Sequence, residues 1–284
     1  MTTPTIGRLR VDGATLHYEV RGSGPLLLLI PGGAGDAASY DGIADELAGD
    51  HTVVSYDPRG LSRSPLDDPQ AVQQVARHAD DAFRLLDLLS PDAPVRVVGC
   101  SSGAIVALHL LCAHYERIER VVAHEPPVVE VLPDAAEHRA LLARVQETFR
   151  RDGLMPAVAE FAAGLRRPDD EGPLATEKAA EKAVELPPRA AARAERTMAN
   201  MPYFLGRVVP SFMAYTPDVD RLAALSDRLV LAGGADSRGE LPYRPAAFLA
   251  ERFGTELVHF PGGHTGLSTH PTEFAELLRK VLSA

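Results

Sequence analysis

Gly99-Cys100-Ser101-Ser102-Gly103 stands between two apolar runs, Val95 to Val98 and Ala104 to Leu108. This order predicts a short buried strand, a tight turn and a helix. Glycines two positions before and after a residue let a strand and a helix approach closely, so that the residue between them is pushed outward on a strained turn. Ser101 has glycines at both positions and Ser102 does not. Ser101 is therefore the candidate nucleophile of a nucleophile elbow.

The residues around this turn belong to an alternation of strands and helices. Asp12-Gly13 separates two strand-like runs, Leu9 to Val11 and Ala14 to Val20, which predicts a hairpin. Further strands are expected at Leu26 to Ile30, Thr52 to Tyr56, Val95 to Val98 and Val121 to Ala123, and helices at Ala37 to Leu47, Ala71 to Leu89 and Ala104 to Tyr115. Apolar strands that alternate with helices predict an α/β fold, with a mostly parallel sheet covered on both faces.

The alternation stops between Val128 and Thr216, where the sequence shows only helical patterns. These fall at Ala135 to Arg150, Met155 to Leu165, Leu174 to Leu186 and Arg189 to Met198. Strands and helices then resume at Arg228 to Ala232, Pro245 to Phe253, Glu256 to Phe260 and Glu273 to Leu282. We therefore predict a core in two parts, 1–127 and 217–284, and an inserted helical cap at 128–216. Such an insertion should lie over the carboxyl ends of the strands, where open α/β sheets bind ligands.

The composition limits the partners and the location of the protein. A chain of 284 residues suits one large α/β domain with an insertion. Its net charge of −10 disfavours nucleic acids and anionic membranes, so we expect a small-molecule substrate. The oligomeric state stays open, a homo-oligomer included. No segment resembles a signal peptide or a membrane span, which indicates a cytoplasmic protein.

The two cysteines do not indicate a metal site or a disulfide. Cys100 and Cys112 are twelve positions apart, and neither belongs to a pair with ligand spacing. We expect both to be reduced structural thiols, and we expect no metal and no cofactor.

A serine nucleophile needs a base, and the base needs a carboxylate that orients it. Asp236 comes just after the strand that ends at Ala232, and His264 comes just after the strand that ends at Phe260. The carboxyl ends of parallel strands meet at one edge of a sheet, so both side chains should lie near Ser101. We therefore predict Asp236 as the acid and His264 as the base. His270 is the alternative base.

Backbone N–H groups are expected to bind the oxyanion that develops on a substrate carbonyl. The N–H of Ser102 lies at the start of the helix, where the helix dipole is positive. A second donor is expected in the loop after Leu26 to Ile30, because glycines at 32 and 33 keep side chains away from the substrate. We predict the N–H of Gly33, with Ala34 as the alternative.

Together these segments resemble the α/β-hydrolase fold superfamily over nearly the whole chain. The elbow, the turn from Tyr56 to Ser62, Gly234-Ala235-Asp236 and Pro261-Gly262-Gly263-His264 match its motifs in order. The chain is similar to bacterial members with an Ile-Pro-Gly-Gly loop and a His-Glu-Pro-Pro segment. It departs from many relatives at Pro31, where they carry a histidine. In those relatives the histidine supports the loop that supplies the second oxyanion donor, here residues 31–36 and called the oxyanion loop.

The resemblance also bears on residues whose charge suggests chemistry. Some members of this fold place the acid after the strand that ends here at Ala123, which makes Glu125 the alternative to Asp236. His124 is expected to be a hydrogen-bonded residue at the end of that strand. Relatives use the turn that contains Asp57 and Arg59 for structure.

The resemblance implies a serine hydrolase that cleaves a carboxylic ester, a lactone or a related acyl compound through an acyl-enzyme. Alternatives are a carbon–carbon bond hydrolase of the same fold, a cofactor-free haloperoxidase or perhydrolase, and a noncatalytic small-molecule receptor. An adaptable apolar lining for the substrate is expected from the end of the cap, unless these side chains only pack the cap against the core. The candidates are Met198, Met201, Phe204, Phe212 and Met213, with Tyr203 and Tyr215 nearby.

Overall fold

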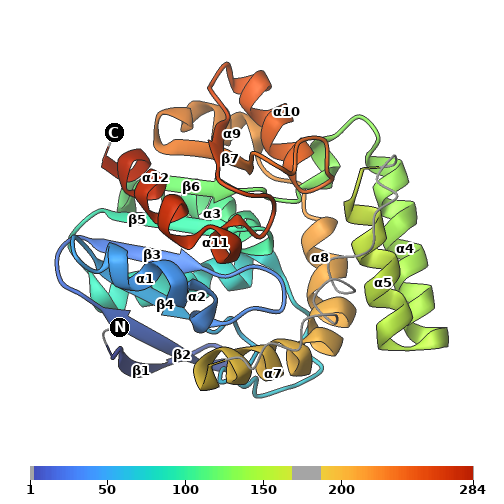
Figure 1. Ribbon diagram of the computed structural model, residues 1–284, viewed down its shortest axis with the longest axis horizontal. Coiled ribbons are helices and arrows are strands. Elements are labelled where there is room, and N and C mark those ends of the chain that lie inside the picture. Colours follow the sequence, from blue (N-terminus) through green and yellow to red (C-terminus); the bar gives the residue numbers. More distant parts are fainter. Residues whose placement is uncertain (1–2, 168–186, 284) are drawn as a thin grey trace.

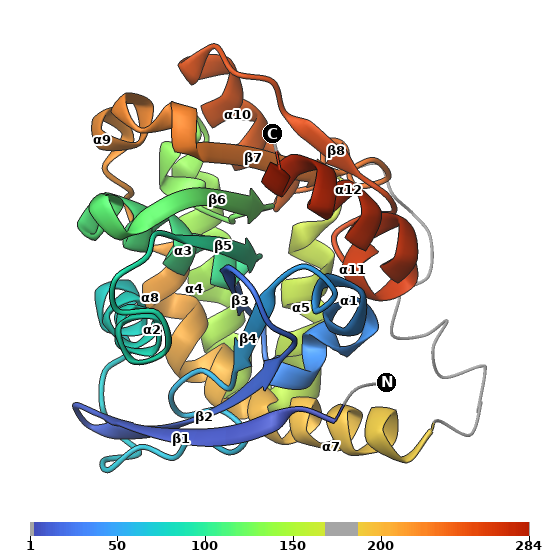
Figure 2. The same ribbon diagram turned by 90° about the vertical axis from the view of Figure 1, so that its left-hand side faces the viewer.

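An eight-stranded sheet forms the centre of the computed structural model, which describes residues 3–167 and 187–283 (Figure 1). The strand order is β1-β2-β4-β3-β5-β6-β7-β8. β1 and β2 form the predicted hairpin, which lies at one edge of the sheet (Figure 2). β2 runs antiparallel to β4, and every later pairing is parallel. The strands are β1 (Thr5–Val11), β2 (Ala14–Arg21), β3 (Leu26–Ile30), β4 (Thr52–Tyr56), β5 (Val95–Cys100), β6 (Ile118–His124), β7 (Leu229–Gly234) and β8 (Val258–Phe260). The predicted α/β fold is confirmed.

Helices cover both faces of this sheet because the strands are apolar on both faces. In β3, Leu27 and Leu29 pack against one cluster with α1 (Asp41–Leu47) and α12 (Pro271–Ser283). Leu28 and Ile30 point to the other cluster, with α2 (Val75–Leu89), α3 (Ser102–Ala113) and α10 (Tyr243–Phe253). The period of two along a strand thus divides one apolar run between two cores.

Shorter elements complete the core. They are the 3-10 turns η1 (Ala37–Tyr40), η2 (Tyr115–Arg117), η3 (Val129–Val131) and η5 (Ser226–Arg228), and the helices α9 (Val219–Ala224) and α11 (Gly266–Thr269). The prediction was wrong at the start of α2, which begins at Val75 rather than Ala71. Val72, which lies before the helix, is 77% exposed.

Between 128 and 216 the described residues contain helices and no strand. These are α4 (Ala135–Asp152), α5 (Leu154–Leu165), α7 (Pro188–Tyr203), the π-helical segment η4 (Phe204–Val208) and α8 (Val209–Met213), called the cap helices below. Figure 1 shows α4, α5 and α8 standing together at one side of the sheet, away from α1 and α12. The predicted helix at Leu174 to Leu186 lies outside the described residues. The division of the chain into core and cap domains stays a prediction.

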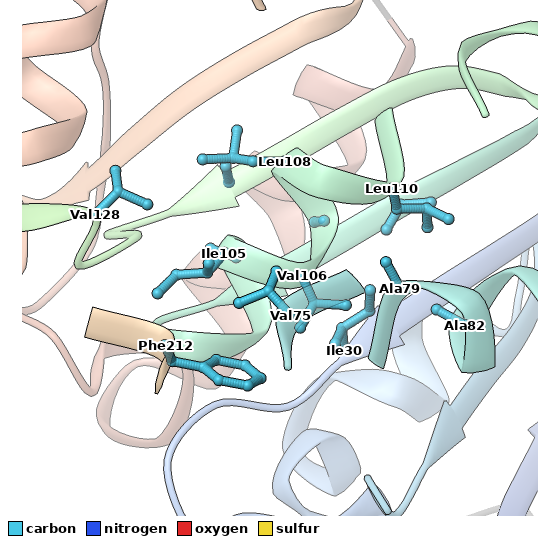
Figure 3. Close-up of a cluster of buried hydrophobic side chains, with 14 of the residues drawn as sticks. Ile30, Val75, Ala79, Ala82, Ile105, Val106, Leu108, Leu110, Val128 and Phe212 are labelled. Carbon is cyan, nitrogen blue, oxygen red and sulfur yellow. The ribbon is translucent and has the colours of Figure 1, made fainter. Parts of the chain in front are cut away.

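The helix that follows Ser101 is held from all sides. α3 is apolar around its whole circumference, and nine of its residues are buried, as expected for a helix inside the core. Figure 3 shows Ile105 and Val106 of α3 near Val75 of α2 and near Phe212 of cap helix α8. The sheet and α2 both contact α3, and Phe212 belongs to the same buried apolar cluster, so packing holds the N-terminus of α3 in place.

Among residues 3–167 and 187–283, the structure contains no helix with the length and apolar content needed to cross a lipid bilayer. The cytoplasmic location stays a prediction.

Candidate active site

Ser101 occupies the strained turn that the glycine spacing predicts. It follows β5 directly, and its φ of 54° and ψ of −125° put a non-glycine residue at positive φ, which is uncommon away from functional sites. A Cβ added at Gly99 would lie 2.4 Å from the carbonyl oxygen of Gly103, and one added at Gly103 would lie 2.2 Å from that of Ile30. Only glycine therefore allows strand and helix to approach this closely.

The structure pairs His264 with Glu125. His264 Nδ1 lies 2.6 Å from Glu125 Oε2, and the Glu125 side chain is fully buried. Glu125 directly follows β6, the neighbour of the strand that leads to Ser101, and the Ser101 N–H donates to His124 O at 2.9 Å. Glu125 also has positive φ, 50°. Ser101 and Glu125 thus directly follow adjacent strands, and both have an uncommon backbone conformation.

Two further donors hold the other oxygen of Glu125. The N–H of Gly234 donates to Oε1 at 2.7 Å, and the Ser237 hydroxyl donates to the same oxygen. Burial opposes ionisation of this carboxyl, but its hydrogen bond to His264 and the histidine's charge lower the pKa of Glu125 below the usual value. A buried carboxylate that is ionised and held on both oxygens can orient an imidazole ring.

The structure does not bring Asp236 to His264, so the choice between the two acids differs from the expectation. Asp236 is exposed, and its backbone N–H donates to Gly262 O at 2.9 Å. β7 ends at Gly234, two residues before Asp236, and it is Ser237 that turns back into the buried edge of the sheet. Ser237 is a residue that sequence reasoning missed, because nothing marks it beyond its place after a strand.

His124 was expected to be hydrogen-bonded, and this was wrong. The ring is 1% exposed, and neither of its nitrogens has a hydrogen-bond partner among the described residues. It lies edge-on to Phe260 and Phe274, with ring centroids 5.7 and 5.5 Å away. Burial among these rings lowers the pKa of His124 to about 4.

The alternative base and the charged turn have other contacts. His270 Nδ1 lies 2.9 Å from the hydroxyl of Thr269 in an exposed position. Asp57 is buried and accepts the N–H of Ala37 at 3.0 Å. Arg59 forms a buried ion pair with Asp81, with Nε 2.6 Å from Oδ2. These contacts give Asp57 and Arg59 structural partners.

The two predicted oxyanion residues contact each other. The N–H of Gly33 donates to the Ser102 hydroxyl at 2.9 Å, and Ser102 is the first residue of α3. Gly33 has φ of 61°, and a Cβ placed on it would meet nothing within 4 Å. The Gly33 peptide therefore lies beside the elbow, with open space where a side chain would be.

An apolar cavity of about 130 Å³ opens onto Ser101 and His264. Three of the five predicted lining residues, Phe204, Phe212 and Met213, border it. The other two do not: Met201 lies outside the lining, and the side chain of Met198 is 54% exposed. The remaining lining residues are Gly33, Ser102, Ile105, Pro127, Phe161, Leu165, Val209 and Pro242.

A second cavity, of about 250 Å³, shares Gly33, Ser101 and His264 with the first. It extends toward η1 and α11 rather than toward the cap helices, and its lining includes Ser39 and Ser268. Ser101 and His264 thus lie where an apolar cavity and a more polar one meet.

Comparisons with known proteins agree with this architecture. The family described as alpha/beta hydrolase fold matches residues 25–215. An uncharacterised hydrolase from Bacillus subtilis, YraK, is 36% identical over 280 residues, which are 97% of this chain and 95% of that protein. The chain therefore belongs to the α/β-hydrolase fold family, as its motifs indicated, and it is a hydrolase.

Two solved structures share the fold over almost their full length. An esterase from Thermogutta terrifontis has a TM-score of 0.74 at 20% identity, and the match covers 99% of this chain and 98% of the esterase. The enol-lactonase from Burkholderia xenovorans has a TM-score of 0.72 at 18% identity, and the match covers 98% of this chain and 100% of that one.

Proposed function

We propose that this protein is a serine hydrolase that cleaves neutral carboxylic esters or lactones with Ser101, His264 and Glu125. The observation that carries the proposal is the 2.6 Å contact between His264 Nδ1 and the buried Glu125, in a cavity that also exposes Ser101 on its strained turn. Nucleophile, base and orienting acid thus leave the ends of three strands of one sheet. This is the arrangement that acyl transfer requires.

In this proposal Ser101 Oγ attacks the substrate carbonyl while His264 Nε2 takes its proton. Glu125 holds the Nδ1–H tautomer and stabilises the imidazolium that forms. The N–H of Ser102 and a backbone donor of the Gly33 loop bind the oxyanion. His264 then returns the proton to the leaving alcohol, and water hydrolyses the acyl-enzyme by the same steps in reverse. The chemistry needs no metal and no cofactor.

The lining of the two cavities supports a neutral substrate. Neither lining contains a lysine or arginine among the described residues. A carboxylate moved into the apolar cavity would lose its hydration without gaining a partner, which is costly. We assign the apolar part of the substrate to the cavity at Phe204, Phe212 and Met213, and the more polar part to the cavity at Ser39. Esters of modest size and neutral lactones carry no charge and have both an apolar and a more polar part.

A fluorophosphonate probe tests the nucleophile. We expect the wild type to be labelled at Ser101, Ser101→Ala to lose the label, and Ser102→Ala, the matched neighbour, to keep it. A wild type without label, or a label that persists in Ser101→Ala, would refute the mechanism.

Substrate class is tested by turnover of p-nitrophenyl esters of graded chain length, neutral lactones and a vinylogous diketone. We expect short and medium esters or lactones to be preferred, because the apolar cavity is small. Strong preference for the diketone would favour the carbon–carbon hydrolase alternative. Tight ligand binding that is unchanged in Ser101→Ala and His264→Ala, without turnover of any compound, would favour a receptor.

A further inference from the structure

The loop that should supply the second oxyanion donor has no histidine to support it. Pro31 stands where a supporting side chain would be, and the next two residues are glycines. Among the described residues no atom packs at the Cβ position of Gly33, and a Gly-Gly pair has more conformational freedom to lose than other residues. The bond from the Gly33 N–H to the Ser102 hydroxyl holds the loop on the side of the elbow, and a further anchor beyond Gly33 is needed to fix its geometry.

Asn200 of cap helix α7 provides such an anchor. Its side chain lies in the last turn of α7 and is 6% exposed. Nδ2 donates to Ala34 O at 2.9 Å and to the Ser62 hydroxyl at 2.8 Å, and Oδ1 accepts the Ser62 N–H at 2.8 Å. Each polar atom of this buried amide is thus bonded to the oxyanion loop or to the turn beneath it.

Arg196, one turn earlier on α7, contacts the end of the same loop. Its Nε lies 2.5 Å from Asp36 Oδ2, and Asp36 is 1% exposed. The Ser62 hydroxyl donates to this same Asp36 oxygen at 3.0 Å. Asp36 in turn caps η1 through the N–H of Ala38. The cap and the core thus meet in one hydrogen-bonded cluster around residues 34–36.

We propose that Asn200 is a positioning residue for the oxyanion loop, with Arg196 as its support, so that the oxyanion site is complete only when α7 is seated on the core. The bond from Asn200 fixes the carbonyl of Ala34, and this restricts the preceding peptides that carry the N–H groups of Gly33 and Ala34. The catalytic part of this inference rests on the serine hydrolase function proposed above.

Asn200→Asp tests the inference with the least change of shape, because it keeps an acceptor for the Ser62 N–H and removes the donor to Ala34 O. Arg189→Ala is the matched control. Arg189 lies on the same helix and pairs with Asp41 and Glu19, away from the loop, with 2.5 Å between Nε and Asp41 Oδ2. Thermal unfolding of each variant shows whether the fold is kept.

Hydrogen exchange of residues 32–36 is the first readout, and it needs no activity. We expect faster exchange in Asn200→Asp than in the wild type or Arg189→Ala. Equal exchange in all three proteins would refute the anchoring.

The second readout compares a trifluoromethyl ketone, whose serine adduct carries an oxyanion, with the matching methyl ketone. We expect the ratio of their affinities, and kcat, to fall by about tenfold to a hundredfold in Asn200→Asp with little change in KM, since small misplacement of a catalytic group has effects of this size. Arg189→Ala, the control, should keep the wild-type ratio of the two affinities.

Two outcomes would contradict these proposals. If the wild type reacts with fluorophosphonate and the ratio of affinities is unchanged in Asn200→Asp, the positioning role of Asn200 alone is refuted. A wild type that does not react would refute the proposed function and the catalytic role of Asn200 with it.

Discussion

The ends of β6 and β7 each present an acidic residue near the candidate site, and they differ in what surrounds it. Glu125 directly follows β6, is fully buried, and has donors on both oxygens. Asp236 lies two residues beyond β7 on the exposed side of its turn. A carboxylate can orient a histidine only from a buried, fixed position. Ser237, one residue further along the turn after β7, is buried and bonds to Glu125, so the side of the turn on which a residue lies, and not its distance from the strand end, decides whether it reaches the buried edge of the sheet.

The largest effect is expected from the acids themselves. Glu125→Gln should lower kcat/KM by about 10³-fold to 10⁴-fold, because an amide in that place favours the wrong tautomer of His264. Asp236→Asn, the matched change at the end of β7, should leave kcat/KM close to that of the wild type. Ester hydrolysis by the two variants measures this directly. The reverse order of effects would overturn the assignment of the acid.

A second prediction concerns the buried end of β6 and depends on pH. His124 has a pKa of about 4 in the folded protein against 6.5 when unfolded, so the unfolded state binds more protons as pH falls. This residue therefore lowers stability below about pH 6.5, and at pH 5 the loss is roughly 2 kcal/mol. His124→Phe should remove that loss.

The measurement is the free energy of unfolding by urea at pH 7 and pH 5, for wild type and variant. The difference between the two pH values cancels the packing effect of the new ring, and the carboxylates other than Glu125, whose pKa His124 also lowers, contribute equally to both proteins. An equal loss in wild type and His124→Phe would contradict the burial of a neutral histidine beside Glu125.

Ser237 links the two strand ends, since it lies after β7 and donates to the acid after β6. Ser237→Ala should lower kcat by about tenfold, because one hydrogen bond to a buried carboxylate contributes about 1.5 to 3 kcal/mol, of which only part reaches the transition state. The fall in kcat at the acidic end of the pH–rate profile should also begin at a higher pH, since the Glu125 carboxylate loses a hydrogen-bond donor. Ser237→Thr, which keeps the hydroxyl, should recover most of the rate. A profile that does not move would assign Ser237 to structure alone.

The smallest effect is expected for stability at the exposed turn. Asp236→Ala should change the free energy of unfolding by less than about 0.5 kcal/mol, as is usual for exposed side chains without special contacts. Urea denaturation at pH 7 checks this, and a loss several times larger would show that the turn depends on the Asp236 side chain.

The sequence predicts the sheet, the elbow and the place of His264 at the strand ends because each leaves a local pattern. Glycines mark Ser101, and a strand followed by a glycine turn marks His264. The acid leaves no such pattern, since Asp236 and Glu125 both follow strands and only three-dimensional geometry decides between them. Positive φ at Glu125, just before Pro126, is unusual for such a residue and has no signature in the sequence.

Contacts between distant segments also leave no local signal. Asn200 and Ala34 are far apart in the chain, and no spacing indicates that they bond. The apolar cluster at the end of the cap includes Phe204, Phe212 and Met213, which line the cavity at Ser101, and their contact with a substrate stays a prediction. The prediction misplaced Met198 and Met201, because composition does not tell which face of a helix points to a cavity.

The proton NMR spectrum of the resting enzyme tests the pairing of His264 with Glu125 without any substrate. A short hydrogen bond from Nδ1–H to a buried carboxylate should give a resonance far downfield of the amide protons. We predict that this resonance is present in the wild type and in Asp236→Asn and is absent in Glu125→Gln. A resonance that survives in Glu125→Gln and disappears in Asp236→Asn would show that His264 pairs with Asp236 and not with Glu125.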